Sequence, residues 1–177
     1  MLPQTIQTTR LQLRKPVPAD AGAIFATYGQ DPAVSKYMVW RPLVRVAEAE
    51  QFIGEAIADW ESQRRFAYVL DRRDRSRQTI GMLDARLEGH IIDVGYVLAR
   101  DFWGRGLMPE ALSAFVAIAL ERESLFRVQA TCDVDNLPSI RTLEKCGFSK
   151  EGRLDRYTLH PNISGEPRPC FMFARCR

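Results

Sequence analysis

The sequence has few of the residues that bind metals or build disulfide frameworks. It contains two histidines, His90 and His160, and its four cysteines form no Cys-x-x-Cys pair. Structural zinc sites need clusters of these residue types, and small secreted domains need a framework of paired cysteines. We therefore expect no metal site, and we expect the cysteines to be reduced thiols in a cytoplasmic protein.

Long apolar runs and a large excess of one charge are also missing. No apolar run reaches the length of a membrane span, and the segment 1–5 does not form the apolar core of a signal peptide. The formal net charge is only +3, which is too small to argue for nucleic-acid binding but does not repel an anionic ligand. We expect neither a membrane nor a nucleic acid as a partner.

What is present is the composition of an ordinary folded domain. The chain has 177 residues, of which 46% are hydrophobic and 27% charged, enough for one domain with a sizeable core. It has no internal repeat and no linker, so we predict a single domain over residues 1–177. Patterns typical of strands and helices alternate along it, which favours an α/β fold.

Seven segments have the pattern of strands: 9–14, 66–70, 79–87, 94–98, 126–132, 148–153 and 170–176. Helical spacing predicts helices from Asp20, near 35–38, over Val46–Gln63, after Pro109 and over 137–146. The order strand, helix, strand across residues 94–132 implies a right-handed parallel crossover.

The most informative stretch, residues 93–112, has the pattern of a strand, a glycine turn and a helix. The run Gly104-Arg105-Gly106 lets the backbone turn tightly and approach a ligand. Pro109 lacks an N–H and prefers the first helical position, which predicts a helix start near Met108. The N–H groups before it then lack intrahelical partners and, with the helix dipole, form an anion site. We expect a phosphorylated ligand there.

Three phosphate-binding patterns compete for this loop. A Walker loop is absent, and a dinucleotide fingerprint fails because Pro109 stands where its third glycine is needed. The acetyl-CoA pyrophosphate loop, [RQ]-x-x-G-x-[GA], remains, with an ordinary glycine-rich turn as the alternative. Through 95–98 and 102–111 the sequence resembles the GNAT acetyltransferases, most closely their ribosomal-protein (RimJ/RimL-type) branch. Asp101 replaces the family's Arg or Gln, so Arg100 or Arg105 is expected to supply the missing charge.

A second segment, Asn136–Phe148, supports two interpretations. From the residues alone, Asn136 caps a helix that Gly147 ends, and Ser139 is a first-turn serine that bonds its own backbone. The segment also resembles the second acetyl-CoA segment of the family. That implies that Asn136 contacts the pantetheine arm and that Ser139 protonates the leaving thiolate. Many members have a tyrosine where this chain has Leu143, one helical turn from Ser139, so either side chain could reach the same spot.

The resemblance covers essentially the whole chain and implies a fold, a co-substrate and a site. The fold is α/β (α+β), with a mixed, mostly antiparallel twisted sheet of about seven strands flanked by helices. The co-substrate is acetyl-CoA. The residues expected to bind it are Val97, Leu98, Arg100, Phe102, Trp103, Gly104, Arg105, Gly106, Leu107, Met108, Asn136 and Ser139.

The resemblance also implies catalytic roles. In the family the fourth and fifth strands splay apart, which makes backbone N–H groups near Val97 candidates to stabilise charge on the thioester oxygen. Asp93 matches an acidic position on the family's fourth strand and is our first choice for the base, with Ser139 as the acid. His90 and Glu151 are weaker choices, and the alternative for Asp93 is a surface acid.

The acceptor is expected to be a primary amine, with a protein N-terminal α-amine first because it loses its proton most easily. A small-molecule amine, such as a polyamine or an aminoglycoside-like compound, and a non-catalytic acyl-CoA-binding sensor are the alternatives. We expect acceptor choice in the helices before Gln63 and in the loop Tyr157–Pro169. Phe25, Tyr37, Trp40 and Trp60 either line that cleft or belong to the core. The oligomeric state stays open, with a homodimer as one alternative.

Overall fold

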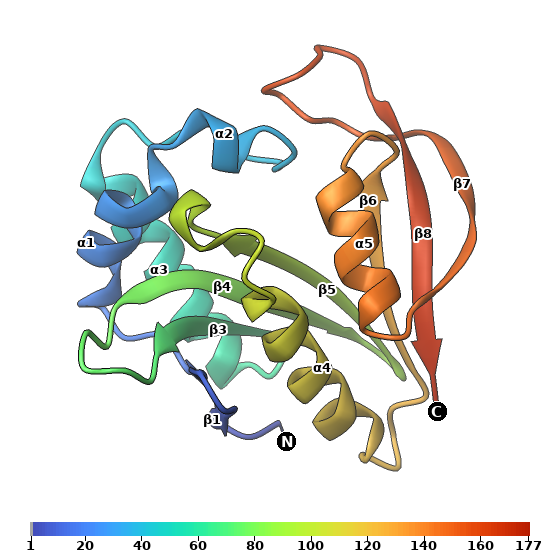
Figure 1. The fold of residues 1–177 in the computed structure, drawn as a ribbon, viewed down its shortest axis with the longest axis horizontal. Helices are drawn as coiled ribbons and strands as arrows, with labels where there is room; N and C mark the ends of the chain where they lie inside the picture. Colours follow the sequence, from blue (N-terminus) through green and yellow to red (C-terminus); the bar gives the residue numbers. More distant parts are fainter. Residues whose placement is uncertain (1) are drawn as a thin grey trace.

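The computed structural model describes residues 2–177 and contains one eight-stranded sheet in the order β1-β2-β3-β4-β5-β6-β8-β7 (Figure 1). The strands are β1 (Thr5–Gln7), β2 (Leu11–Arg14), β3 (Arg65–Arg72), β4 (Thr79–Glu88), β5 (Ile91–Leu98), β6 (Arg127–Asp133), β7 (Ser149–Thr158) and β8 (Arg168–Cys176). The helices are α1 (Asp20–Ile24), α2 (Pro32–Ser35), α3 (Val46–Glu61), α4 (Leu107–Leu120) and α5 (Leu137–Lys145). A π-helical turn (Phe25–Gly29) extends α1, and a short 3-10 turn (Arg100–Phe102) follows β5.

The predicted mixed, mostly antiparallel sheet is confirmed. Every pair of neighbouring strands is antiparallel except β5 and β6, which are parallel and joined through α4. The sheet has one strand more than the seven that were predicted. The additional strand is β1, which has only three residues with Ile6 as the one buried side chain, so it is too short for alternation to reveal.

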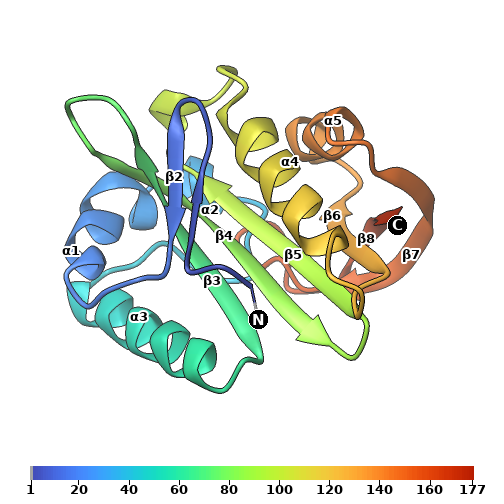
Figure 2. The same cartoon turned by 90° about the horizontal axis from the view of Figure 1, so that it is seen from below.

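Helices cover both faces of the sheet. α1 and α3 lie on one face of β3–β5, while α4 lies on the other face with α5 beside it along β6 (Figures 1 and 2). The apolar stripe of α4 is buried, and the Phe115 ring packs against Tyr68 of β3 with 5.7 Å between ring centroids. Trp60 of α3 is also buried, and its indole Nε1 donates to the Ala67 carbonyl oxygen over 2.7 Å. Trp60 therefore belongs to the core.

The start of α4 differs from the prediction by a small but informative amount. The helix begins at Leu107, and Pro109 is its third residue rather than its first. Gly106 precedes the helix with φ of 70°, a left-handed conformation that turns the chain directly into the first turn. A proline fits anywhere in that turn, because the N–H groups there have no intrahelical acceptor.

The parallel pairing between β5 and β6 covers only part of either strand. β5 pairs with β4 from Ile91 to Leu98, and β6 pairs with β8 from Arg127 to Asp133. Between β5 and β6 the register covers only 91–93 against 127–129. Beyond Asp93 the two strands separate, and the sheet opens between them.

Two further features of residues 2–177 complete the description. No helix there is both long enough and apolar enough to cross a membrane. All four cysteines are free thiols, of which Cys132, Cys146 and Cys170 are buried.

Candidate active site

The open edge of β5 presents backbone groups of alternate residues to the gap. The His90 carbonyl accepts from Phe126 N–H over 3.1 Å on the β6 side, and Ala99 N–H donates to Ile80 of β4 over 2.8 Å. Backbone groups of alternate residues point to opposite edges of a strand. The N–H groups of Tyr96 and Leu98 therefore face the gap, whereas that of Val97 faces β4. Donors near Val97 are thus those of its two neighbours.

The chain after β5 is fixed against the strand end by two aromatic residues. The indole Nε1 of Trp103 donates to the Leu98 carbonyl oxygen over 2.7 Å, although half of the Trp103 side chain is exposed. Phe102 is buried, and the guanidinium groups of Arg72 and Arg105 lie 5.3 and 5.4 Å from its ring centre. The 3-10 turn therefore holds the glycine loop at the mouth of the gap.

The glycine loop has the conformation that its sequence predicts. Gly104 and Gly106 have φ of 72° and 70°, a region that residues with a Cβ rarely occupy. Leu107 and Met108 bury their side chains in the core, while their N–H groups lie in the first turn of α4 where no helical carbonyl can accept them. These donors and the helix dipole suit an anionic ligand.

Positive charge gathers beside this loop. A pocket of about 350 Å³ is lined by Thr9, Arg10, Arg72, Arg73, Asp74, Phe102, Arg105 and Leu107. Asp101, which stands where an Arg or Gln was expected, is exposed and carries no positive charge to this pocket. Of the two replacements expected, Arg100 lies 3.2 Å from the Asp31 carboxylate, on the side of α2. Arg105 lines the pocket and is therefore the better placed.

The glycine loop is also hydrogen-bonded to the N-terminal hairpin that β1 and β2 form. Arg10 donates to the carbonyl oxygens of Arg105 and Gly106 over 2.9 and 3.2 Å. Its Nε lies 2.6 Å from the Glu110 carboxylate of α4, which also accepts from Thr8. Burial acts to raise the pKa of Glu110, but the hydrogen bonds from Thr8 and Arg10 outweigh it and lower the pKa.

Helix α5 forms the opposite wall of the gap. Asn136 caps it, and its Oδ1 accepts from Ser139 N–H over 3.3 Å, as predicted from the sequence alone. Ser139 Oγ lies 2.8 Å from the Tyr96 hydroxyl of β5. Leu143 is fully buried in the core, so it does not share the position of Ser139 in the gap. The expectation that either side chain could reach the same spot is therefore wrong.

Tyr96 was not among the expected site residues. It is the one hydroxyl-bearing side chain of β5, within the apolar run after Asp93, which is the signal that the sequence offered. Side chains alternate along a strand, so Tyr96 and Asp93 lie on opposite faces. Helix α4, which follows the glycine loop, and Ser139 lie on the Tyr96 face, whereas Asp93 lies on the other.

Asp93 occupies the last paired position before the strands separate. Its carboxylate lies 2.9 Å from Arg86 of β4. Burial raises the pKa of Asp93, Asp84 adds to this, and Arg86 and Gln129 act against it. The weaker candidates lie at the closed end of the gap: exposed His90 in the β4–β5 turn, and Glu151 in an ion pair with Arg127.

The β7–β8 loop and the segment after α2 meet at the open end of the gap. The Asn162 side-chain amide donates to the carbonyl oxygens of Ser35 and Trp40, each over 2.7 Å. Tyr37 donates to the Asp135 carbonyl oxygen over 3.1 Å. The two stretches expected to choose the acceptor are thus in direct contact.

A buried ion pair holds the base of that loop. Asp133 at the end of β6 is fully buried and accepts from Arg168 of β8 over 2.5 Å. Burial opposes ionisation of this carboxyl, but Arg168 and the Asp135 N–H outweigh it and lower the pKa of Asp133. His160 is buried next to this pair, with its ring edge-on to Tyr37.

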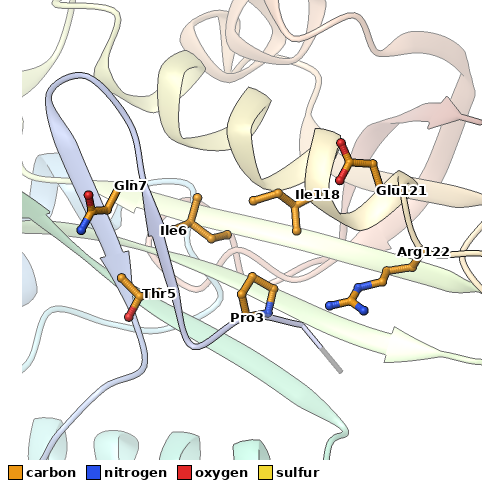
Figure 3. A pocket seen from close by; sticks show the side chains of 7 residues that line it. All are labelled: Pro3, Thr5, Ile6, Gln7, Ile118, Glu121 and Arg122. Atoms are coloured by element: carbon orange, nitrogen blue, oxygen red, sulfur yellow. The ribbon is translucent and has the colours of Figure 1, made fainter.

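A second surface groove lies far from these residues. It has a volume of about 450 Å³ and is lined by Pro3, Thr5, Ile6, Gln7, Ile118, Glu121 and Arg122 (Figure 3). Its helical residues are at the C-terminal end of α4, whereas the glycine loop is at the N-terminal end. A helix of this length separates the two by roughly 20 Å. The groove shares no residue with the candidate site.

Comparison with known proteins identifies the family. The model of the acetyltransferase (GNAT) domain matches residues 10–149. The chain is 32% identical over 157 residues to the uncharacterised N-acetyltransferase p20 of Bacillus licheniformis, covering 87% of each chain. It is 30% identical over 154 residues to the uncharacterised N-acetyltransferase YoaA of Bacillus subtilis, covering 86% of each. The chain therefore belongs to the GNAT acetyltransferase family.

Solved structures show the same fold. The microcin C7 self-immunity acetyltransferase MccE, solved with acetyl-CoA and AMP, superimposes with a TM-score of 0.89 at 20% identity, over 99% of this chain and 97% of the other. RimL, a ribosomal L7/L12 α-N-protein acetyltransferase solved with coenzyme A, gives 0.87 at 21% identity over 97% of each. A Vibrio cholerae protein described as a ribosomal-protein-serine acetyltransferase gives 0.85 at 25% identity over the full length of both.

The protein is thus an acetyl-CoA-dependent N-acetyltransferase with RimJ/RimL-like structural neighbours. Its own geometry fits this co-substrate. The left-handed glycines and first-turn donors of α4 suit a pyrophosphate, and the nearby arginines suit its charge. The unpaired edge of β5 offers backbone groups along the gap to an extended arm.

The loop assignment predicts a ligand-specific effect of Gly106→Ala. A Cβ strains the left-handed backbone at this position, and relief of that strain shifts the donors that face the ligand, so acetyl-CoA affinity should fall about tenfold or more. Gly89→Ala is the matched control, because Gly89 also has positive φ, 59°, but lies in the β4–β5 turn. Calorimetry on both folded variants gives the comparison. Equal affinities would place the pyrophosphate elsewhere.

Proposed function

We propose that this enzyme acetylates the N-terminal α-amine of a protein by direct attack on acetyl-CoA in a ternary complex. The observation that supports this choice is the character of Asp93. It is the last residue of β5 that pairs with β6 before the sheet opens, and it is held in an ion pair with Arg86. Such a group is a modest base, which favours an amine that gives up its proton easily.

The free energy of deprotonation separates the acceptor classes. An α-amine with a pKa near ~8 costs roughly 1 kcal/mol to deprotonate at pH 7, whereas a lysine near ~10.4 costs roughly 4–5 kcal/mol. Without a strong base, the lysine cost would appear almost entirely in the rate. RimL, a structural neighbour, is named for α-N-protein acetylation, which agrees with this argument.

In the proposed mechanism the two faces of β5 have separate tasks. Acetyl-CoA supplies an activated acetyl thioester. Backbone N–H groups of Tyr96 and Leu98 stabilise charge on the thioester oxygen, and the cap residue Asn136 holds the pantetheine arm. Ser139 protonates the leaving thiolate. Asp93, on the opposite face, accepts the first proton of the acceptor, the one that its ammonium form must lose before the attack.

The acceptor enters, in this proposal, at the open end of the gap between the segment after α2 and the β7–β8 loop. The hydrogen bonds of Asn162 to Ser35 and Trp40, and the edge-on contact of the Tyr37 and His160 rings, join these two stretches into a single surface. Both stretches are separate from the glycine loop. The four free thiols are compatible with work in the reducing cytoplasm.

The acceptor class is tested by measuring release of free CoA thiol with a panel of amines. The panel contains peptides with free and with blocked N-termini, a lysine peptide, a polyamine and an aminoglycoside. We expect turnover with free N-terminal peptides and at least tenfold lower kcat/KM with the lysine peptide, because of its higher amine pKa. Preference for the polyamine or the aminoglycoside would assign a small-molecule acceptor instead.

The base assignment predicts pH profiles that move in opposite directions. Asp93 acts when deprotonated, so activity falls as pH drops through its pKa. Arg86→Gln removes a charge that lowers this pKa and should move the acidic limb to higher pH. Asp84→Asn removes a charge that raises it and should move the limb to lower pH. Rates relative to wild type cancel the titration of the amine itself.

Asp93→Asn should lower kcat by about 100-fold, at the low end of the range for general-base catalysis. An unchanged kcat, or identical pH profiles for Arg86→Gln and Asp84→Asn, would make Asp93 a surface acid.

The acceptor location predicts a selective effect of Asn162→Ala. Losing both hydrogen bonds to the α2 segment should loosen the entrance and raise KM for the acceptor by about threefold to tenfold. Affinity for acetyl-CoA should stay within about twofold, since the glycine loop is untouched. Glu166→Ala, an exposed change in the same loop, is the control. Loss of acetyl-CoA affinity with a normal acceptor KM would mean that the two sites are reversed.

A further inference from the structure

The hydroxyl groups of Tyr96 and Ser139 are in contact in the gap, and the mechanism above gives Tyr96 no side-chain role. The phenol oxygen of Tyr96 lies 2.8 Å from Ser139 Oγ and 3.3 Å from the Ser139 carbonyl oxygen. The two residues are 43 positions apart and belong to the two walls of the gap, β5 and α5. Ser139 therefore does not use its side chain merely to bond the first turn of its own helix.

The direction of this hydrogen bond decides what Ser139 can do. Each hydroxyl has a single hydrogen. If Ser139 donates to Tyr96, its hydrogen points away from a leaving group. If Tyr96 donates, the hydrogen of Ser139 can be directed at sulfur, either at the Cys132 thiol, which also hydrogen-bonds Ser139, or at the sulfur of a leaving group. Ser139 Oγ is the nearer of the two acceptors around the phenol, and burial raises the pKa of Tyr96, so the phenol keeps its proton.

We propose that Tyr96 is a positioning residue for acetyl transfer: its phenol donates to Ser139 Oγ and directs the Ser139 hydrogen toward the leaving sulfur. This inference rests on the proposed role of Ser139. It adds the Tyr96 hydroxyl, which does not touch the reacting atoms and acts only through the Ser139 hydroxyl.

The proton count of the step closes within the known reaction. As the carbon–sulfur bond breaks, the Ser139 O–H bond also breaks and an S–H bond forms. The ammonium group has already given one proton to Asp93, and the nitrogen loses a second proton when the amide forms. That second proton reaches Oγ through water in the same step, so no free alkoxide forms and Tyr96 keeps its own proton. The partial negative charge on Oγ during the transfer strengthens the hydrogen bond from Tyr96, because charged acceptors form stronger bonds.

Kinetics of three variants test the pairing. Ser139→Ala should lower kcat by about 10–100-fold, and Tyr96→Phe by about tenfold, because a thiolate needs less help than a poorer leaving group. The double variant should be no slower than Ser139→Ala, since both changes remove one device. The dissociation constant of acetyl-CoA should stay within about twofold in each, as the hydroxyls act when charge reaches sulfur.

Tyr68→Phe is the matched control. Tyr68 is a buried tyrosine of the same sheet, and its phenol donates to the Pro3 carbonyl oxygen over 2.7 Å, away from the gap. It loses a comparable hydrogen bond and should keep its kcat. Ser139→Thr preserves the hydroxyl and should retain more activity than Ser139→Ala, but only while Tyr96 is present.

A binding measurement gives a readout that needs no acceptor. The thiol of bound CoA is titrated by the ultraviolet absorbance of its thiolate. A hydroxyl directed at sulfur should lower the bound thiol pKa below its ordinary value near ~8.5. Tyr96→Phe and Ser139→Ala should each remove that shift, whereas Tyr68→Phe should keep it.

The outcomes distinguish this proposal from the one on which it rests. If Ser139→Ala changes neither kcat nor the bound thiol pKa, the role of Ser139 fails and this inference fails with it. If Ser139→Ala has its effect but Tyr96→Phe does not, only the role of Tyr96 is overturned. Losses that multiply in the double variant would also overturn it, because the two hydroxyls would then act separately.

Discussion

The site depends on the short parallel contact between β5 and β6. Each strand has a full-length antiparallel partner on its other side, so the sheet remains cohesive although the two share only three residue pairs. The separation after Asp93 leaves backbone donors unpaired, which a folded chain tolerates only where water or a ligand can reach them. α4 and α5 then place the glycine loop and the Asn136 cap along the two sides of the opening.

The parts of the site that were predicted from the sequence are those that depend on the conformational preferences of single residues. Gly104 and Gly106 were recognised because a left-handed backbone conformation favours glycine. Asn136 was recognised because asparagine is a preferred residue at the N-cap of a helix. Pro109 placed the start of α4 near Met108, one residue late, because a proline is equally tolerated throughout the first turn. β1 was missed because three residues cannot show alternation.

The contacts that could not be predicted join residues distant in the chain. No spacing rule links Tyr96 to Ser139, or Asn162 to the α2 segment, because both contacts depend on how β5, α5 and the β7–β8 loop meet in space. The same limit explains Leu143. Helical spacing placed it on the face of Ser139, but only packing shows that this part of the face is core.

The hydrogen bonds and the ion pair that link the N-terminal hairpin to the glycine loop and α4 join two distant parts of the chain into one cooperative unit. Arg10 and Thr8 bind Glu110 and the loop carbonyls, so local opening of β1 and β2 would release the loop as well. By linkage, a ligand that needs the ordered loop must also suppress fraying of the hairpin. The order of the first dozen residues of this enzyme is thus coupled to its cofactor affinity.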